Sequence, residues 1–253
     1  GTSATETSLG AGTYSVTITD QNGCTDSASV TLTEPTALSA LASVSSTLDC
    51  NGDTDGQVTA SGSGGTGSYT YSWNTGGTSA TETGLGAGTY SVTVTDQNGC
   101  TDSASVTLTE PTTLAASAAV SSTLDCNGDT DGQVTASGSG GTGSYTYSWN
   151  TGATSATETG LGAGTYSVTI TDQNGCTDSA SVILTEPAVL VSSAAVSSPL
   201  DCNGDTDGQV IASGSGGTSP YTYSWNTGGT SATETSLGAG TYSVTITDQN
   251  GCT

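Results

Sequence analysis

The sequence contains no lysine, arginine or histidine, and this absence excludes several classes of function. Its 253 residues include 23 aspartates and glutamates, so the formal net charge is −23. Without cations to neutralise phosphate, the chain repels nucleic acid and anionic lipid, and we predict that it binds no nucleic acid. The usual general base for a serine nucleophile and the usual cation for an oxyanion are missing too. We therefore predict that the protein is not an enzyme.

Long apolar runs are absent as well. No stretch approaches the 18 consecutive apolar residues typical of a transmembrane helix, so we expect no membrane insertion in these residues. Neither an initiator methionine nor a signal peptide is visible. Because the sequence starts and stops inside a repeat, we expect it to be a segment of a longer array. The secretion and anchoring segments are then expected outside it.

A repeat of 76 residues dominates what is present. Trp73, Trp149 and Trp225 are spaced by this period, and the stretch Leu-Asp-Cys-Asn-Gly-Asp-Thr-Asp-Gly-Gln-Val begins at Leu48 and returns twice. Such a period is too long for a solenoid coil and suits a small independent domain. We predict four parts, which are the end of a module (1–35), two complete modules (36–111 and 112–187) and a module without its last strand (188–253).

Each module alternates apolar and polar residues in short segments separated by turns rich in glycine, asparagine and aspartate. This pattern predicts about six strands and no helix, with one buried and one exposed face per strand. An open sheet of this size buries too little area, so two packed sheets are expected. The predicted fold class is all-β, in tandem immunoglobulin-like β-sandwich modules. Trp73, Trp149 and Trp225 are predicted core residues, with an exposed sugar-stacking platform as the alternative.

The cysteines lie at alternating separations of 26 and 50 residues. Two uniform pairings follow, and we favour the one across 50 residues because the 26-residue stretch contains two strands whose outer ends would be too far apart for a disulfide. The predicted bonds are Cys50–Cys100, Cys126–Cys176 and Cys202–Cys252, each inside one module, and Cys24 then pairs upstream of Gly1. Regular cysteines without a catalytic partner indicate an oxidising, extracytoplasmic compartment.

Oxygen ligands at alternate positions followed by glycine make the loop after Leu48 resemble the first half of an EF-hand, although the twelfth position is Gly62 and not glutamate. The predicted disulfide would bring the turn at Asp96 beside this loop. The two loops are therefore a candidate calcium site, and plain turn chemistry is the alternative. No other cofactor is expected. The candidate ligands are Asn51, Asp53, Asp55 and Asp96, with their counterparts Asn127, Asp129, Asp131, Asp172, Asn203, Asp205, Asp207 and Asp248.

Two segments of the last module carry a family resemblance. Gly216–Trp225 reads Gly-Gly-Thr-Ser-Pro-Tyr-Thr-Tyr-Ser-Trp, and Leu237–Cys252 ends in Asp-Gln-Asn-Gly-Cys. Together they closely resemble the SprB-type repeat of very large surface adhesins of Bacteroidetes, which is related in style to PKD-like sandwiches. The first two copies lack the proline, with serine at Ser68 and Ser144. The resemblance implies secretion, display on the bacterial cell surface and a role in adhesion or gliding, and it carries over no catalytic residue.

Near-identical modules favour a structural function, because function then lies in repetition and not in one site. We predict an extracellular stalk or filament of rigid modules, stapled by disulfides. Its expected partners are further copies of the repeat, in the same chain or by self-assembly. The alternative is an array of modules that bind calcium or surface glycans.

Overall fold

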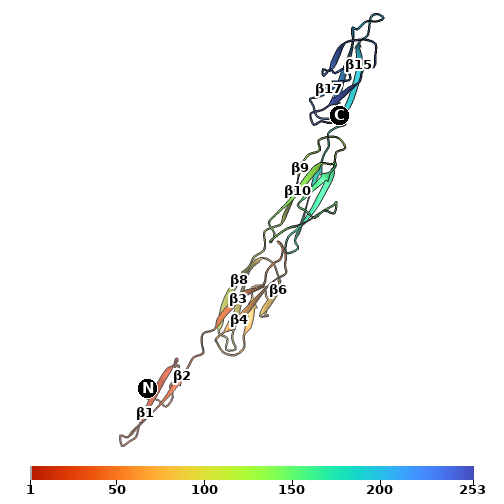
Figure 1. Cartoon of the computed structure of the whole chain (residues 1–253). Coiled ribbons are helices and arrows are strands. Elements are labelled where there is room, and N and C mark those ends of the chain that lie inside the picture. The colour runs from red at the N-terminus through yellow and green to blue at the C-terminus, as the bar shows by residue number, and fades with distance from the viewer. Residues whose placement is uncertain (1) are drawn as a thin grey trace. The chain divides into compact units, whose positions relative to one another are not determined.

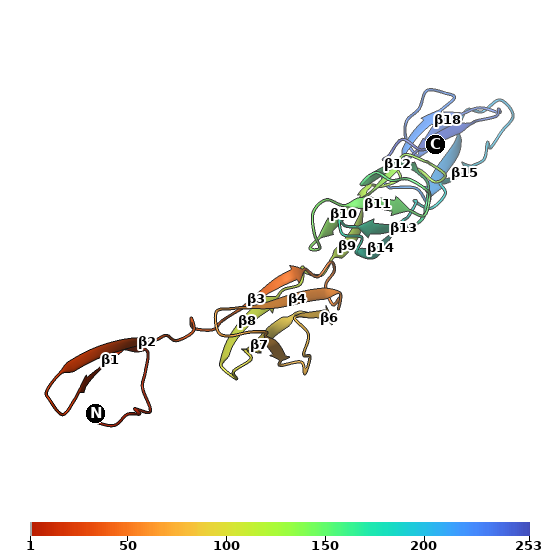
Figure 2. The same ribbon diagram turned by 90° about the horizontal axis from the view of Figure 1, so that it is seen from below.

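The computed structural model describes residues 2–253, and every regular element in them is a β-strand. The chain divides into two compact units, one ending at Glu110 and the other running from Pro111 to Thr253. The first unit holds a hairpin of β1 (Gly12–Thr19) and β2 (Thr25–Leu32), drawn at the red end of the chain in Figure 2, followed by the first module. The second unit holds the second and third modules. The four-part division of the sequence remains a prediction.

The first module consists of two three-stranded antiparallel sheets, in the orders β3-β4-β6 and β5-β7-β8. Its strands are β3 (Ser39–Ser46), β4 (Gly56–Ser63), β5 (Thr70–Trp73), β6 (Thr81–Leu85), β7 (Gly88–Thr95) and β8 (Thr101–Leu108). The second module repeats this arrangement, and Figure 1 labels β9 beside its partner β10. Its strands are β9 (Ala115–Ser122), β10 (Gly132–Ser139), β11 (Thr146–Trp149), β12 (Thr157–Leu161), β13 (Gly164–Thr171) and β14 (Thr177–Leu184).

The third module has one strand fewer among the described residues. Its sheets are β15-β16-β18 and β17-β19. The strands are β15 (Val191–Ser198), β16 (Gly208–Ser215), β17 (Thr222–Trp225), β18 (Thr233–Leu237) and β19 (Val244–Thr247). The all-β, tandem immunoglobulin-like architecture with a 76-residue period, predicted from alternation and turn residues, is therefore confirmed.

Each module has its own small apolar core between its two sheets. In the first module Val58 and Val94 are fully buried, and Trp73 retains 3% of its surface. The Trp73 indole N–H donates to the Ser79 carbonyl at 2.9 Å, so its one polar group is satisfied inside the core. Tyr71 and Tyr90 pack against this core while remaining partly exposed. The tryptophans are thus core residues and not an exposed platform.

Strand directions place the two cysteine-containing loops of a module, which recur in every repeat, at opposite ends. Strand β5 starts opposite the end of β7, with Thr70 paired to Thr95, whereas β6 ends opposite the start of β4, with Leu85 paired to Gly56. Across the sheets, Ala40 at the start of β3 bonds to Asp102 at the start of β8, so these two strands start at the same end. Since all the pairs within each sheet are antiparallel, β5 and β6 run in the same direction, in different sheets. We call the end with residues 47–55 the Cys50 end and the end with residues 96–100 the Asp96 end, and use the equivalent names in the other modules. Strands of eight residues separate the two ends by roughly 25 Å.

A buried aspartate organises the Asp96 end. The Asp96 Oδ1 accepts the N–H groups of Asn98 and Cys100, and its Oδ2 accepts the N–H of Thr66 at 2.9 Å. Gly65 adopts a positive φ of +62° there, and a Cβ at that position would lie 2.7 Å from Asp96 Oδ2. Burial raises the pKa of Asp96, but the hydrogen bonds from these three backbone N–H groups outweigh it and hold the pKa below its ordinary value. Asp172 and Asp248 repeat the arrangement.

A second aspartate ties the two sheets together. The Ala40 N–H on β3 donates to the Asp102 Oδ2 on β8 at 2.8 Å, and Ala116 and Asp178 form the same bond in the second module. The hydrogen bond from Ala40, together with that from Ser103, lowers the pKa of Asp102. Because the bond joins a strand of one sheet to a strand of the other, it fixes how the sandwich closes at this end.

Replacing the three turn aspartates by asparagine should reduce the acid sensitivity of the fold. Their folded pKa values lie below the ordinary value, so their stabilisation is complete above about pH 4 and is lost as the pH falls through the depressed values. We expect thermal unfolding of the Asp96→Asn, Asp172→Asn, Asp248→Asn variant to occur at lower temperature than wild type at pH 7, with a flatter decline towards pH 2.5. Circular dichroism melts measure both.

The matched control exchanges the exposed aspartates Asp55, Asp131 and Asp207 for asparagine. It should melt close to the wild type at pH 7. Equal acid sensitivity in the turn variant and the wild type would contradict the structural role of the turn aspartates.

The last residue of β14 offers a second test, because it fills the core. Leu184 is 2% exposed, whereas its neighbour Ile183 is 66% exposed. Leu184→Ala should lower the free energy of unfolding of the second module by about 2–5 kcal/mol through lost burial and the cavity left behind. Ile183→Ala should cost under about 1 kcal/mol. Hydrogen exchange of β13 and β14 measures both, and equal protection in the two variants would show that Leu184 is not a core anchor.

Candidate functional site

A disulfide links the second module to the third. Cys126, in the loop between β9 and β10, is bonded to Cys252, in the turn after β19, with their Cα atoms 5.7 Å apart and a sequence separation of 126. Beside it, the Asn250 side-chain amide donates to the Asp125 carbonyl at 2.9 Å and to Thr218 Oγ1 at 3.3 Å. The Cys126 end of one module is therefore held to the Asp248 end of the next by a covalent bond and a hydrogen bond.

The predicted pairing within modules is wrong. Cys126 bonds to Cys252, which lies in the next module. The predicted bonds Cys126–Cys176 and Cys202–Cys252 are therefore not formed. Cys50 and Cys176 are disulfide-bonded as well, whereas Cys24, Cys100 and Cys202 are exposed free thiols, which excludes Cys50–Cys100. The physical reason is the direction of β6, which places the two cysteines of one module at opposite ends, far beyond the reach of a disulfide.

Hydrogen bonds to Asp248 fix the conformation of the turn that contains Cys252. Asp248 Oδ1 accepts the N–H groups of Asn250 and Cys252, both at 2.9 Å, and the Cys252 carbonyl accepts the Asp248 N–H. The hydrogen bond from Thr218 comes first among the causes that lower the pKa of Asp248, and those from Cys252, Asn250 and Gly251 add to it against the opposing effect of burial. The carboxylate therefore stays ionised near neutral pH and keeps the turn rigid.

The loop on the other side of the junction is also ordered by a carboxylate. Asp129 Oδ2 accepts the Cys126 N–H at 3.0 Å, and the Gly128 N–H donates to Glu186 at 2.7 Å. The Asn127 amide donates to the Pro187 carbonyl at 3.0 Å. Glu186 and Pro187 begin the connection to the third module, so this loop is fastened to the chain segment that crosses the junction. The first module shows the corresponding bond from Gly52 to Glu110.

The candidate calcium ligands do not come together as predicted. Asp53 lies at one end of the module and Asp96 at the other, because the strand directions place their loops at opposite ends of the sandwich. Asp53, Asp129 and Asp205 each accept the N–H of a cysteine three residues earlier. The neighbouring aspartates and asparagines of these loops are exposed; they are Asn51, Asp55, Asn127, Asp131, Asn203 and Asp207. Within residues 2–253 no three acidic, cysteine or histidine side chains gather as a metal site.

Sequence reasoning missed Asp125 and Asn250, which flank the disulfide. The separation of 126 residues is one repeat of 76 plus the 50 residues between two cysteines, so the cysteine spacing would have indicated this disulfide once pairing between successive modules is considered.

Among residues 2–253 there is no helix long and apolar enough to span a bilayer.

Comparison with known proteins identifies the repeat. The family model of the SprB repeat matches residues 42–78, 118–154 and 194–230. Each matched stretch runs from within the first strand of a module to just past its tryptophan. A search of curated proteins finds no match to this chain.

Among solved structures, one on Dscam isoform specificity matches at 16% identity, with a TM-score of 0.29 over 65% of this chain and 51% of that one. The chain thus spans about half the length of the Dscam structure. The C-terminal 282-residue fragment of intimin, in complex with the intimin-binding domain of its translocated receptor, matches at 16% identity with a TM-score of 0.30 over 63% and 67%. These scores are too low for the likenesses to bear on function. The family match rests on sequence, and the chain carries three tandem SprB repeats, one in each module.

Proposed function

We propose that the chain is a tension-bearing stalk segment of a bacterial surface adhesin and has no enzymatic activity. The observation that carries this proposal is the Cys126–Cys252 disulfide, which joins successive modules instead of closing one. Disulfides persist in oxidising surroundings, which agrees with an extracellular location at the cell surface. The SprB repeats support the same setting.

The position of the disulfide changes how the chain carries a pulling force. Tension that enters at Cys126 passes through the sulfur atoms to Cys252, so the loop between these two cysteines cannot be fully extended while the bond is intact. The small cores of the second and third modules need not resist the full load by themselves. A stalk under shear gains from this arrangement because an unfolding module would otherwise lengthen it and expose apolar surface.

The amino-acid composition also supports a stalk function. A net charge of −23 with no cation makes neighbouring chains repel one another, which keeps long stalks apart in water. The buried carboxylates Asp96, Asp172 and Asp248 each accept three backbone hydrogen bonds, so they are engaged in the fold and poorly placed to act as general acids or bases.

Single-molecule pulling of the oxidised and the reduced chain, held by tags at its two ends, tests this proposal. The loop closed by Cys126–Cys252 spans 126 residues, and an extended chain measures about 3.3–3.6 Å per residue. Reduction should therefore lengthen the fully extended chain by at least about 410 Å.

The matched control is Cys202→Ser, which removes an exposed free thiol and should leave the oxidised length unchanged. Equal extended lengths before and after reduction would show that the disulfide is outside the load path. The stalk proposal would then lose the observation on which it rests.

A further inference from the structure

A hydrogen bond from a side chain to the backbone lies directly beside the disulfide of the junction. The Asn250 Nδ2 donates to the Asp125 carbonyl oxygen at 2.9 Å, and the Cys252 sulfur is 3.4 Å from the same oxygen. Asp125 immediately precedes Cys126, and Asn250 stands two residues before Cys252. The hydrogen bond therefore aligns the two cysteines, and it requires no bond between their sulfur atoms.

The third module itself fixes the direction of the Asn250 amide. Besides its bond across the junction, the amide nitrogen donates to Thr218 Oγ1 at 3.3 Å within its own module. The two hydrogens of an amide nitrogen allow both bonds. The Thr218 N–H donates to Asp248 Oδ2 at 2.8 Å, and Asp248 Oδ1 accepts the Asn250 N–H at 2.9 Å. The side chain and the backbone of Asn250 are thus both held by partners that lie inside the third module.

The acceptor is fixed by the second module and its connection to the third. Asp129 Oδ2 accepts the Cys126 N–H at 3.0 Å, next to the Asp125 carbonyl. The Gly128 N–H donates to Glu186 at 2.7 Å, which ties the loop to the segment that leads into the third module. None of these bonds involves sulfur, so hydrogen bonds alone shape both surfaces of the junction.

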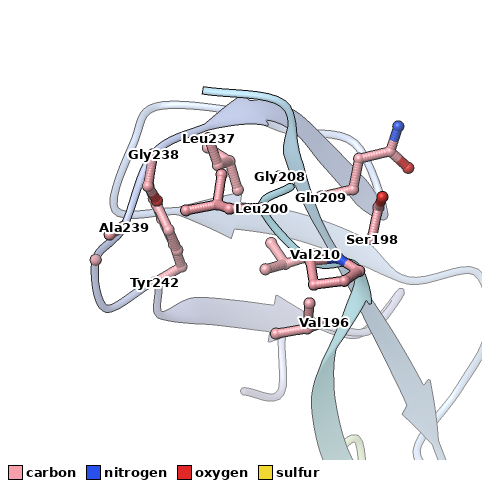
Figure 3. A pocket seen from close by; sticks show the side chains of 12 residues that line it. Val196, Ser198, Leu200, Gly208, Gln209, Val210, Leu237, Gly238, Ala239 and Tyr242 are labelled. Atoms are coloured by element: carbon pink, nitrogen blue, oxygen red, sulfur yellow. The ribbon is translucent and has the colours of Figure 1, made fainter. Parts of the chain in front are cut away.

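Strand directions keep the other cysteine of the third module away from this junction. Figure 3 shows the opposite end of the module, where Leu200 lies beside Gly208 at the start of β16. Leu200 is two residues before Cys202, so that cysteine belongs to this opposite end. The partner of Cys252 consequently comes from another module, and it is Cys126.

We propose that Asn250 is a positioning residue for the Cys126–Cys252 disulfide. Its hydrogen bond to Asp125 docks the third module on the second while both cysteines are still thiols, so that oxidation finds the sulfur atoms side by side. Holding two reacting groups in place turns their slow encounter into a fast intramolecular step. The disulfide then seals a contact that the fold has already made, and this order of events is independent of the use of the chain as a stalk.

Oxidation by a small-molecule disulfide, such as oxidised glutathione, proceeds in two exchange steps. In the first, one cysteine thiolate attacks a glutathione sulfur, which forms a mixed disulfide and releases one reduced glutathione. In the second, the other cysteine thiolate attacks the protein sulfur of the mixed disulfide, which forms Cys126–Cys252 and releases a second reduced glutathione. The two thiol protons pass through solvent to the released glutathione thiolates, and two electrons reduce one glutathione disulfide. Asn250 acts on the second step, because only this step needs both cysteines together.

Rapid-quench mass spectrometry of the reduced 253-residue chain measures the two steps separately, with serine at every cysteine except Cys126 and Cys252. Asn250→Ala should slow the second step by about two- to tenfold, the factor expected from one ordinary hydrogen bond, and leave the first step unchanged. Thr218→Val loses the hydroxyl but keeps the backbone N–H to Asp248, and it should slow the second step less. The matched control is Gln249→Ala, whose side chain is exposed in the same turn, and both steps should then equal those of the parent chain.

Equilibrium in a glutathione redox buffer gives the effective concentration of one thiol at the other. The parent chain should show a value well above the millimolar range of a flexible tether, and Asn250→Ala should lower it by the same factor as the closure rate. A parent value in the millimolar range, or closure that is equally fast in Asn250→Ala and Gln249→Ala, would overturn the positioning role. None of these outcomes depends on whether the disulfide carries load, which the pulling experiment tests by itself.

Discussion

Strands β5 and β6 run in the same direction in opposite sheets, and the linkage between modules depends on this. If each strand reversed the one before it, the Asp96 turn would return to the end where Cys50 lies. Instead Thr70 and Leu85 mark opposite ends of the sandwich, and the two cysteines of a module face away from each other. A disulfide can then form only with another module, as Cys126 does with Cys252.

The carboxylates of these modules replace the ion pairs that an acidic chain without cations cannot form. Asp248 binds backbone N–H groups from two segments of its own module, and the turn that results presents Asn250 and Cys252 to the second module. Asp178 joins one sheet to the other in the same way. Hydrogen bonds from neutral amides stabilise an ionised acid without a counter-charge, which lets the fold keep its uniform negative charge.

The cores are small, and the way in which each is closed decides what the module can do. In the first two modules the last strand inserts a leucine between the sheets, opposite a glycine whose missing side chain leaves room for it. The third module has the same walls, with Leu200, Val210 and Leu237 around a hollow of about 280 Å³ (Figure 3). In the first two modules the last strand therefore completes both the core and one sheet.

Alternation of apolar and polar residues, with turns between, was enough to predict the strands, the sandwich and the buried tryptophans, because these follow from local periodicity and burial. The repeat followed directly from the stretches of sequence that recur every 76 residues. The motif around Trp225 was enough to indicate the SprB repeat. The disulfide pairing and the separation of Asp53 from Asp96 were decided by tertiary structure alone, since they depend on the direction in which β6 crosses the module. A sequence states how far apart two cysteines are along the chain, but only the fold determines which ends of which modules meet.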